Sequence, residues 1–383
     1  MKKRGFALLG VVVALAILAV MAKGIAVLVA NNDNSRMKEQ YSVQSYYLGE
    51  AAFQYALNEV TIQGASSIPN LDFIGTSLGL STSGGKIYSS VNYDGALRAF
   101  SITKPNTLGP ACIYVLASSG SGAVNLSGST SLGSSTCGMY VNSSSSTAVE
   151  LQGSATINSY FLNLVGNYNL LGGTSITTNK GTVTAYNGAT GIVTTGATAV
   201  SDPLASYNMP TYSSCNYTNE SLQSGTTTIN PGVYCNGLQI GNTAVVHMNA
   251  GNYIVDGGYF SVAGSATLTG SGVTVFLNKQ LETTWPTVSF SNGATVTLTA
   301  PTTGTYAGIA IFQSRSATSA TNSILGGGAV NITGAIYLPN QALDFYGGSS
   351  SSTPCTMIVA NTLTLGGAAY INCSAGSLSG LIN

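Results

Sequence analysis

The sequence predicts a mainly β protein in which one long N-terminal α-helix is followed by a parallel, right-handed β-helix. Three observations indicate this fold class. Residues 6–30 are almost entirely apolar, glycine is abundant at 47 of 383 residues, and the short apolar strands that open at Gly232, Gly251 and Gly272 are 19 and 21 residues apart. A repeat of this length, with three short strands per unit, is typical of a β-helix. Tandem β-sandwiches are the alternative, because their strands also recur every 8–12 residues or so.

The low charge content argues against a nucleic-acid-binding protein and against an ordinary soluble domain. Only 6% of residues are charged, 12 basic and 12 acidic, against about 25% in an ordinary soluble domain. Zero net charge leaves no broad basic surface, so nucleic acid is not expected as a partner. The single histidine, His247, argues against a metal site built on histidines, and neither a metal nor a cofactor is expected.

Residues 6–60 are predicted to form the long helix. Residues 6–30 are long enough to cross a bilayer, and the basic residues 2–4 would keep the N-terminus in the cytoplasm. A secretory signal peptide is the rival interpretation, but its apolar region would be shorter and would end in a small-residue cleavage site. The stripe that continues the helix consists of Met37, Tyr41, Leu48, Ala52 and Tyr55, at helical spacing.

The start of the chain resembles a type IV prepilin leader. Lys2-Lys3-Arg4-Gly5-Phe6 precedes the apolar run, and residues 46–60, YYLGEAAFQYALNEV, are similar to the N-terminal signature of PilX-type minor pilins. The resemblance implies that residues 1–5 are a leader, which a prepilin peptidase removes between Gly5 and Phe6 before Phe6 is methylated. Gly10 stands where major pilins carry a glutamate, which favours a tip or initiating position. A plain signal-anchor helix with no pilus role is the alternative.

The remaining chain is expected to form two parts. Residues 61–110 read as a small transition module with a β-hairpin over 85–105, around Asp94-Gly95. Residues 111–383 read as the β-helix, with inward aliphatic residues alternating with outward Ser, Thr and Asn. Segments of it, among them APTTGTYAGIAIFQ (300–313) and GAIYLPNQALDFYG (334–347), are similar to the outer domain of TadG-like pilus-assembly proteins. That resemblance implies a fold and no established chemistry.

The cysteines favour disulfides. Six cysteines allow 15 pairings, but sequence neighbours are separated by 25, 20 and 18 residues, close to one unit of the repeat, and adjacent units stack at about 4.8 Å. The predicted bonds are Cys112–Cys137, Cys215–Cys235 and Cys355–Cys373. Disulfides would place this part of the chain in an oxidising compartment. Six free buried thiols are the alternative.

No active site is expected. Polysaccharide enzymes need clustered carboxylates, whereas the acidic residues of 105–383 are separated by 18 residues or more. Asp202 and Asp256 read as turn residues, and His247 as an outward strand residue. Trp285, in an insertion between strands, is a candidate for stacking on a sugar ring, or it simply covers a loop.

The sequence therefore predicts a non-catalytic, pilin-like minor pilus or cell-surface protein that displays a disulfide-braced β domain, with a role as a tip adhesin. Its expected location is a single-pass membrane position before assembly, with the C-terminal domain outside, and then the pilus or cell surface. Expected partners are other pilin-like subunits through the helix, the membrane, the prepilin peptidase, and a surface glycan or host ligand. A membrane-tethered polysaccharide enzyme and a static envelope scaffold are the alternatives.

Overall fold

The computed structural model divides into two compact units, Met1–Gly109 and Pro110–Asn383. The division falls beside the predicted start of the last domain at residue 111. The residues that the structure describes are 18–19, 21–23, 30, 33, 35–48, 71–73, 76–83, 86–93, 96–103, 111–134, 136–187, 189–291, 293–325, 329–347 and 357–372.

The helical residues of the first unit correct two predictions. The longest helical segment among the described residues is 35–48, with further helical residues at 18–19, 21–23, 30 and 33. The single long helix predicted for 6–60 is therefore not borne out, and the rest of that range lies outside the described residues. No helix within the described part of the chain is long and apolar enough to cross a membrane. This corrects the expected single-pass location.

The first unit also contains a four-stranded antiparallel sheet. Its strands, in chain order and in sheet order, are β1 (Leu71–Phe73), β2 (Thr76–Ser83), β3 (Lys86–Tyr93) and β4 (Ala96–Thr103). Strands β3 and β4 are the antiparallel pair predicted for 85–105. The module is larger than one hairpin, because β1 and β2 extend the sheet.

The second unit begins with short strands that recur in sets of three, here called the first block. Each strand of a set pairs in parallel with its counterpart in the next set. The block ends at β14, which pairs antiparallel with β13. Its strands are β5 (Ala111–Val115), β6 (Val124–Leu126), β7 (Ser131–Ser134), β8 (Gly138–Val141), β9 (Val149–Leu151), β10 (Thr156–Ser159), β11 (Leu162–Leu164), β12 (Tyr168–Leu170), β13 (Ser175–Thr178) and β14 (Gly181–Thr184).

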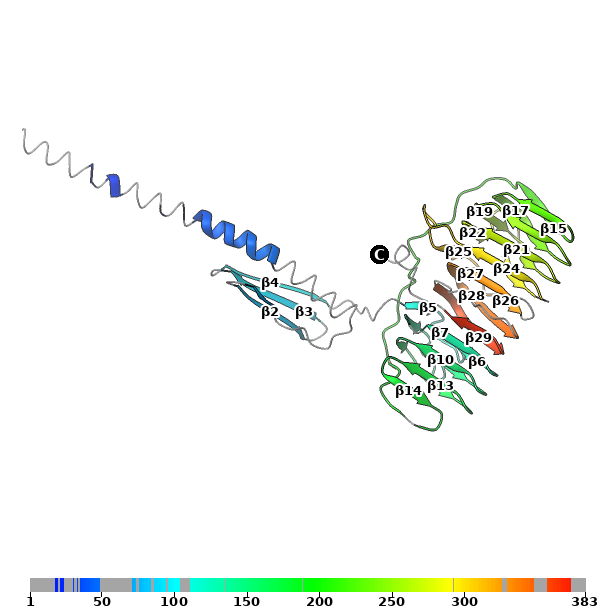
Figure 1. Ribbon diagram of the computed structural model, residues 1–383, viewed down its shortest axis with the longest axis horizontal. Coiled ribbons are helices and arrows are strands. Elements are labelled where there is room, and N and C mark those ends of the chain that lie inside the picture. Colours follow the sequence, from blue (N-terminus) through cyan, green and yellow to red (C-terminus); the bar gives the residue numbers. More distant parts are fainter. Residues whose placement is uncertain are drawn as a thin grey trace, which may run out of the picture. The chain divides into compact units, whose positions relative to one another are not determined.

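A second block follows from residue 217, again with parallel pairing between successive sets (Figure 1). Its strands are β15 (Tyr217–Leu222), β16 (Thr226–Ile229), β17 (Gly232–Ile240), β18 (Val245–Met248), β19 (Gly251–Asp256), β20 (Tyr259–Val262), β21 (Thr267–Ser271), β22 (Val273–Asn278), β23 (Thr287–Phe290), β24 (Thr295–Thr299), β25 (Ile309–Gln313), β26 (Thr321–Leu325), β27 (Val330–Thr333), β28 (Ala335–Gly347), β29 (Met357–Gly367) and β30 (Tyr370–Asn372).

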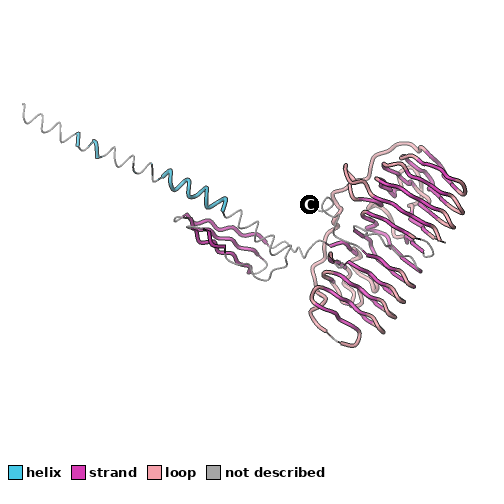
Figure 2. Tube along the Cα trace, viewed as in Figure 1, coloured by secondary structure: helices cyan, strands magenta, loops and turns pink. Residues whose placement is uncertain are grey.

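The two blocks meet where the end of the chain returns to its beginning. Strand β29 pairs in parallel with β28 on one side and with β5 and β6 on the other, and β30 pairs with β7. Residues 189–216, here called the strap, connect the two blocks. They run from the first block to β15, at the far end of the second, and appear as a long loop along one side of the unit (Figure 2).

Long strands join neighbouring sheets into one. The first part of β17 pairs with β19 and its last part with β20, and β28 likewise pairs with both β25 and β26. Eight strands thereby close a circuit of parallel pairings, in the order β28, β25, β22, β19, β17, β20, β23 and β26. The circuit belongs to a sheet of 16 strands, and two five-stranded sheets, β14-β13-β10-β7-β30 and β16-β18-β21-β24-β27, are separate from it among the described residues. The other strands of the large sheet are β5, β6, β8, β9, β11, β12, β15 and β29.

These pairings correct the predicted fold class. The structure is mainly β, but a closed circuit of strands with additional sheets replaces the single β-helix expected after a long helix. Tandem β-sandwiches are not found either, because every pairing of the second unit within the described residues is parallel except β13 with β14. The physical reason is that a repeat fixes the spacing of strands but not the order in which they stack. The strap carries the chain past its own first block, so that the later strands are added back toward β5.

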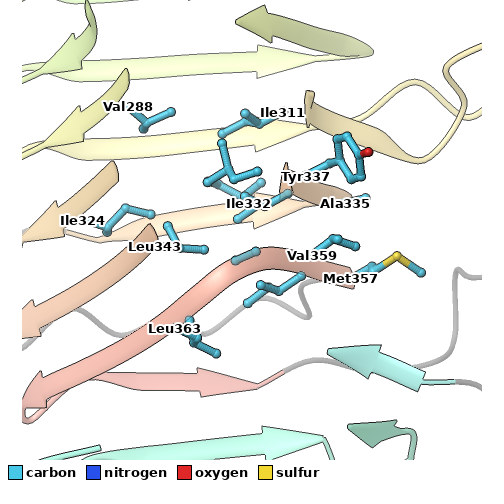
Figure 3. Packing of buried hydrophobic residues seen from close by; sticks show 14 of the residues in the cluster. Val288, Ile311, Ile324, Ile332, Ala335, Tyr337, Leu343, Met357, Val359 and Leu363 are labelled. Carbon is cyan, nitrogen blue, oxygen red and sulfur yellow. The ribbon is translucent and has the colours of Figure 1, made fainter. Parts of the chain in front are cut away.

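Aliphatic and aromatic side chains fill the interior of the second unit. Figure 3 shows Ile311, Ile324 and Ile332, from β25, β26 and β27, directed toward a common core. Leu363 of β29 is fully buried and aligned with Leu343 of β28 and Val124 of β6. The core is therefore continuous across the junction of the two blocks, which explains how strands distant in sequence are held together.

Candidate functional site

The predicted cysteine pairs can be compared with the structure for four of the six residues. Cys112 bonds Cys137 with Cα atoms 5.6 Å apart, and Cys215 bonds Cys235 with Cα atoms 5.7 Å apart. Both bonds are pairs that the sequence spacing predicts, and each links neighbouring sets of strands. Cys355 and Cys373 lie outside the described residues, and so do the predicted leader residues Gly5 and Phe6.

Trp285 lies in the loop between β22 and β23. Its side chain is half-buried, and the Lys279 Nζ atom lies over the ring at 5.3 Å from the centroid. An ammonium group in this position is attracted to the negative face of the aromatic ring. Lys279 therefore occupies a ring face on which a sugar would stack, and nothing in the loop favours the predicted ligand role over a packing role.

Asp256 fixes the loop that carries Trp285. The carboxylate is fully buried and accepts backbone N–H bonds from Gln280 (3.0 Å), Leu281 (2.7 Å) and Glu282 (3.3 Å). Tyr212 of the strap also reaches this carboxylate, and burial together with the Asp256 charge raises the pKa of the Tyr212 hydroxyl. Asp256 is therefore the buried last residue of β19 and not the turn residue that the sequence predicts, and its carboxylate also holds the strap.

An ion pair holds the strap at a second point. The Arg315 Nε atom lies 3.1 Å from the Asp202 Oδ2 atom, and the Tyr337 hydroxyl donates to the same oxygen at 2.5 Å. Burial, followed by the hydrogen bond and charge of Asp202, raises the pKa of Tyr337. The Arg315 guanidinium also donates to the backbone oxygens of Tyr207 and Leu204. Asp202 keeps the predicted turn role through the Leu204 N–H.

Further contacts attach the strap along its length. Near its start it bonds the first block, because the Asn142 side chain exchanges two hydrogen bonds with the Val200 backbone. Farther on, the Tyr306 hydroxyl donates to the Asn208 backbone oxygen at 3.0 Å. The strap is therefore attached to both blocks by these hydrogen bonds and by the ion pair of Asp202.

A regular, partly exposed surface lies on the outer side of the sheet β16-β18-β21-β24-β27, here called the hydroxyl face. Alternate residues of these strands are buried, apart from the half-buried Thr227 and Gly270, and the residues between them are at least partly exposed. Because pairing is parallel and in register, the outward residues form rows across the sheet. Row 1 contains Thr226, Val245, Thr267 and Thr295; row 2 contains Thr228, His247, Thr269, Thr297 and Asn331; row 3 contains Ser271, Thr299 and Thr333.

A shallow groove of about 340 Å³ lies between rows 2 and 3. His247, Thr269 and Thr297 line it from row 2, and Ser271 and Thr299 from row 3. The His247 Nδ1 atom and the Thr269 Oγ1 atom are 2.7 Å apart. As predicted, His247 is an outward strand residue. The five strands contain no Asp, Glu, Lys or Arg, so the groove presents hydroxyl groups and one imidazole, and Met248 and Gly270 complete its lining.

The three rows were not predicted from the sequence, although alternating threonines mark several of their positions. Alternating threonines occur at 226 and 228, at 267 and 269, and at 295, 297 and 299. Alternation places side chains on one side of a strand, but only the register shows that the three segments are neighbours in one sheet. The ion pair of Asp202 with Arg315 carried no such signal, because the partners are 113 residues apart.

Comparison with known proteins finds a family model that matches one part of the chain. Residues 190–374 match a family model described as a domain of unknown function (DUF7305), which covers slightly less than half of the chain. The match begins in the strap and continues past β30, so it includes the second block and the hydroxyl face but not the first block. No curated protein and no solved structure matches the chain.

Proposed function

We propose that this protein is a non-catalytic, pilin-like binding protein whose ligand surface is the hydroxyl face. The observation that carries the proposal is the uncharged, exposed array of threonines around a groove on a disulfide-braced scaffold. Such a surface offers many hydrogen-bond donors and acceptors. It is suited to hold a neutral ligand rather than to transform one.

The positions of the acids support binding without catalysis. Asp202 and Asp256 are already engaged in holding the strap and the loop 280–282. Asp344 and Glu150 belong to one row of outward residues, but Thr364 and Asn125 lie between them in the register. Three strand spacings correspond to about 14 Å, whereas paired carboxylates of glycosidases are roughly 5–9.5 Å apart.

The test measures retention and chemistry in the same sample. The purified full chain is passed over immobilised neutral and acidic polysaccharides and over glycoproteins, and each soluble ligand is assayed for new reducing ends and unsaturated products. We expect retention on at least one neutral ligand with no product. A product that disappears in the Asp344→Asn or Glu150→Gln variant would establish an enzyme instead. No retention on any ligand would favour a static scaffold.

The pilin-like part of the proposal rests on residues 1–6 and 46–60 and has its own test. The protein recovered from producing cells is analysed by N-terminal mass spectrometry, in wild type and in a Gly5→Leu variant. We expect a methylated Phe6 in wild type and an uncleaved leader in the variant. An intact Met1 in wild type would contradict assembly by pilus machinery while leaving ligand binding untouched.

A further inference from the structure

We propose that the groove of the hydroxyl face binds a linear, neutral polysaccharide whose chain lies across the strands, between rows 2 and 3. This inference rests on the proposed function and names the ligand class of the same surface. The first reason is charge complementarity. No Asp, Glu, Lys or Arg lies on the five strands, so a charged ligand would lose hydration without gaining a carboxylate, ammonium or guanidinium partner there.

The second reason is the chemistry of the lining groups. Threonine and serine hydroxyls each donate one hydrogen bond and accept others, as sugar hydroxyls do. His247 adds a ring nitrogen, and the Thr269 hydroxyl already lies within hydrogen-bond distance of it. Groups on both sides of the groove can therefore bond to a sugar ring, since Thr297 of row 2 and Thr299 of row 3 both line the groove from the same side of β24.

The third reason is the periodicity. Thr269 and Thr297 are direct neighbours in row 2, and Ser271 and Thr299 in row 3. Equivalent hydroxyls thus recur about every 4.8 Å from strand to strand. A linear polymer that repeats its own hydroxyls can be contacted by each successive strand, whereas a monosaccharide contacts one or two. The many weak contacts then act together, so the affinity should rise with chain length.

The experiment compares chain lengths and variants by isothermal titration calorimetry. Linear glucan, mannan and galactan are each tested as the monosaccharide, a short oligosaccharide and a long chain against the full-length protein. For the ligand that binds, we expect the long chain to bind and the monosaccharide to give no measurable heat. Thr269→Val with Thr297→Val removes two hydroxyls while keeping the branched shape, and should weaken binding about tenfold or more, that is ~1.4 kcal/mol.

Two further variants make the result specific. Thr297→Ser keeps the hydroxyl and should retain the affinity within about twofold. Thr156→Val removes a hydroxyl from β10, on the corresponding sheet of the first block, where Thr156 bonds Ser131, and should also leave the affinity unchanged. Circular dichroism checks the fold of each variant, and the single Thr297→Val carries the test if the double variant does not fold.

The failures of the inference and of the proposed function can be told apart. The inference is overturned if the double valine variant binds as tightly as wild type, if affinity does not depend on chain length, or if anionic polysaccharides bind best. In these cases the protein is still a binding protein, whereas cleavage of the polysaccharide or no binding at all would overturn both.

Discussion

The Asp256 carboxylate shows how one residue can position a whole loop. It accepts three backbone N–H bonds from residues 280–282 while fully buried. In Asp256→Asn one acceptor becomes an N–H₂ donor that faces the Leu281 N–H. We expect the free energy of unfolding to fall by about 2–3 kcal/mol, because hydrogen bonds to charged groups are the strong ones. Urea unfolding measures this loss.

The fluorescence of Trp285 shows whether the Asp256→Asn substitution disturbs the loop 280–282 locally. It is the only tryptophan of the chain and lies in the loop that Asp256 holds, so the Asp256→Asn variant should emit at longer wavelength as the ring becomes more exposed. The matched control is Asp202→Asn, which disturbs the ion pair with Arg315 and leaves this loop alone. A shift of equal size in both variants would contradict the local role of Asp256.

The Asp344 carboxylate gives a prediction about pH. Burial raises its pKa, although Thr364 donates a hydrogen bond that acts in the opposite direction. A raised pKa means that the folded protein binds this proton more tightly than the unfolded chain, so the stabilisation is present at low pH and is lost as the pH rises through the folded pKa.

Asp344→Asn should therefore be slightly more stable than wild type at pH 7, by up to about 0.5 kcal/mol. The difference should shrink as the pH falls through the raised folded pKa toward about 4, and it should change little at lower pH, where both states of wild type become protonated. Thermal unfolding at pH 7 and pH 3.5 measures both values. A variant that is less stable at pH 7 would show that the bond from Thr364 outweighs burial.

At the scale of elements, a disulfide near the C-terminal end of the strap holds the strap against the second block. Cys215–Cys235 joins the end of the strap to β17 across a separation of 20 residues. Replacing both cysteines by alanine should lower the free energy of unfolding by about 2–4 kcal/mol and should make residues 205–216 more sensitive to limited proteolysis. The control is the alanine pair at Cys112 and Cys137, which should lose stability without new cleavage in the strap. Equal cleavage in both variants would contradict this account.

The sequence predicts elements far better than their arrangement. The strands that open at Gly232 and Gly251 are adjacent and parallel, as their spacing indicates, and Asn242, in the turn between β17 and β18, adopts the positive φ angle expected there. The pairing of β29 with β5, however, joins residues almost 250 positions apart. No local periodicity contains that information, since it depends on the path of the strap and on the fit of two complete blocks.

The candidate site, too, could be predicted from the sequence only at the level of single strands. The threonines that alternate at 295, 297 and 299 are visible as outward positions of one strand. Their alignment with Thr267, Thr269 and Ser271 depends on a parallel register set across an intervening connection of more than 20 residues. The hydroxyl face therefore belongs to the tertiary structure, and composition alone could show only that hydroxyl residues are plentiful.

At the scale of the whole second unit, the shared core should make the two blocks unfold together. Leu363 of β29 is aligned with both Leu343 and Val124. Leu363→Ala should cost about 2–5 kcal/mol, and hydrogen exchange in increasing urea should show the same lowered midpoint for peptides from β8 and from β22. A shift confined to β22 would mean that the blocks are independent domains.

Recognition through hydroxyl groups without ionic contacts should make the binding of a neutral polysaccharide insensitive to salt. Screening at high ionic strength weakens contacts between charged groups but not between neutral ones. For the neutral polysaccharide that the full chain binds best, we predict a dissociation constant that changes by less than about twofold between low salt and roughly 1 M salt. A loss of affinity of about tenfold or more would show that charged residues outside the hydroxyl face carry the interaction.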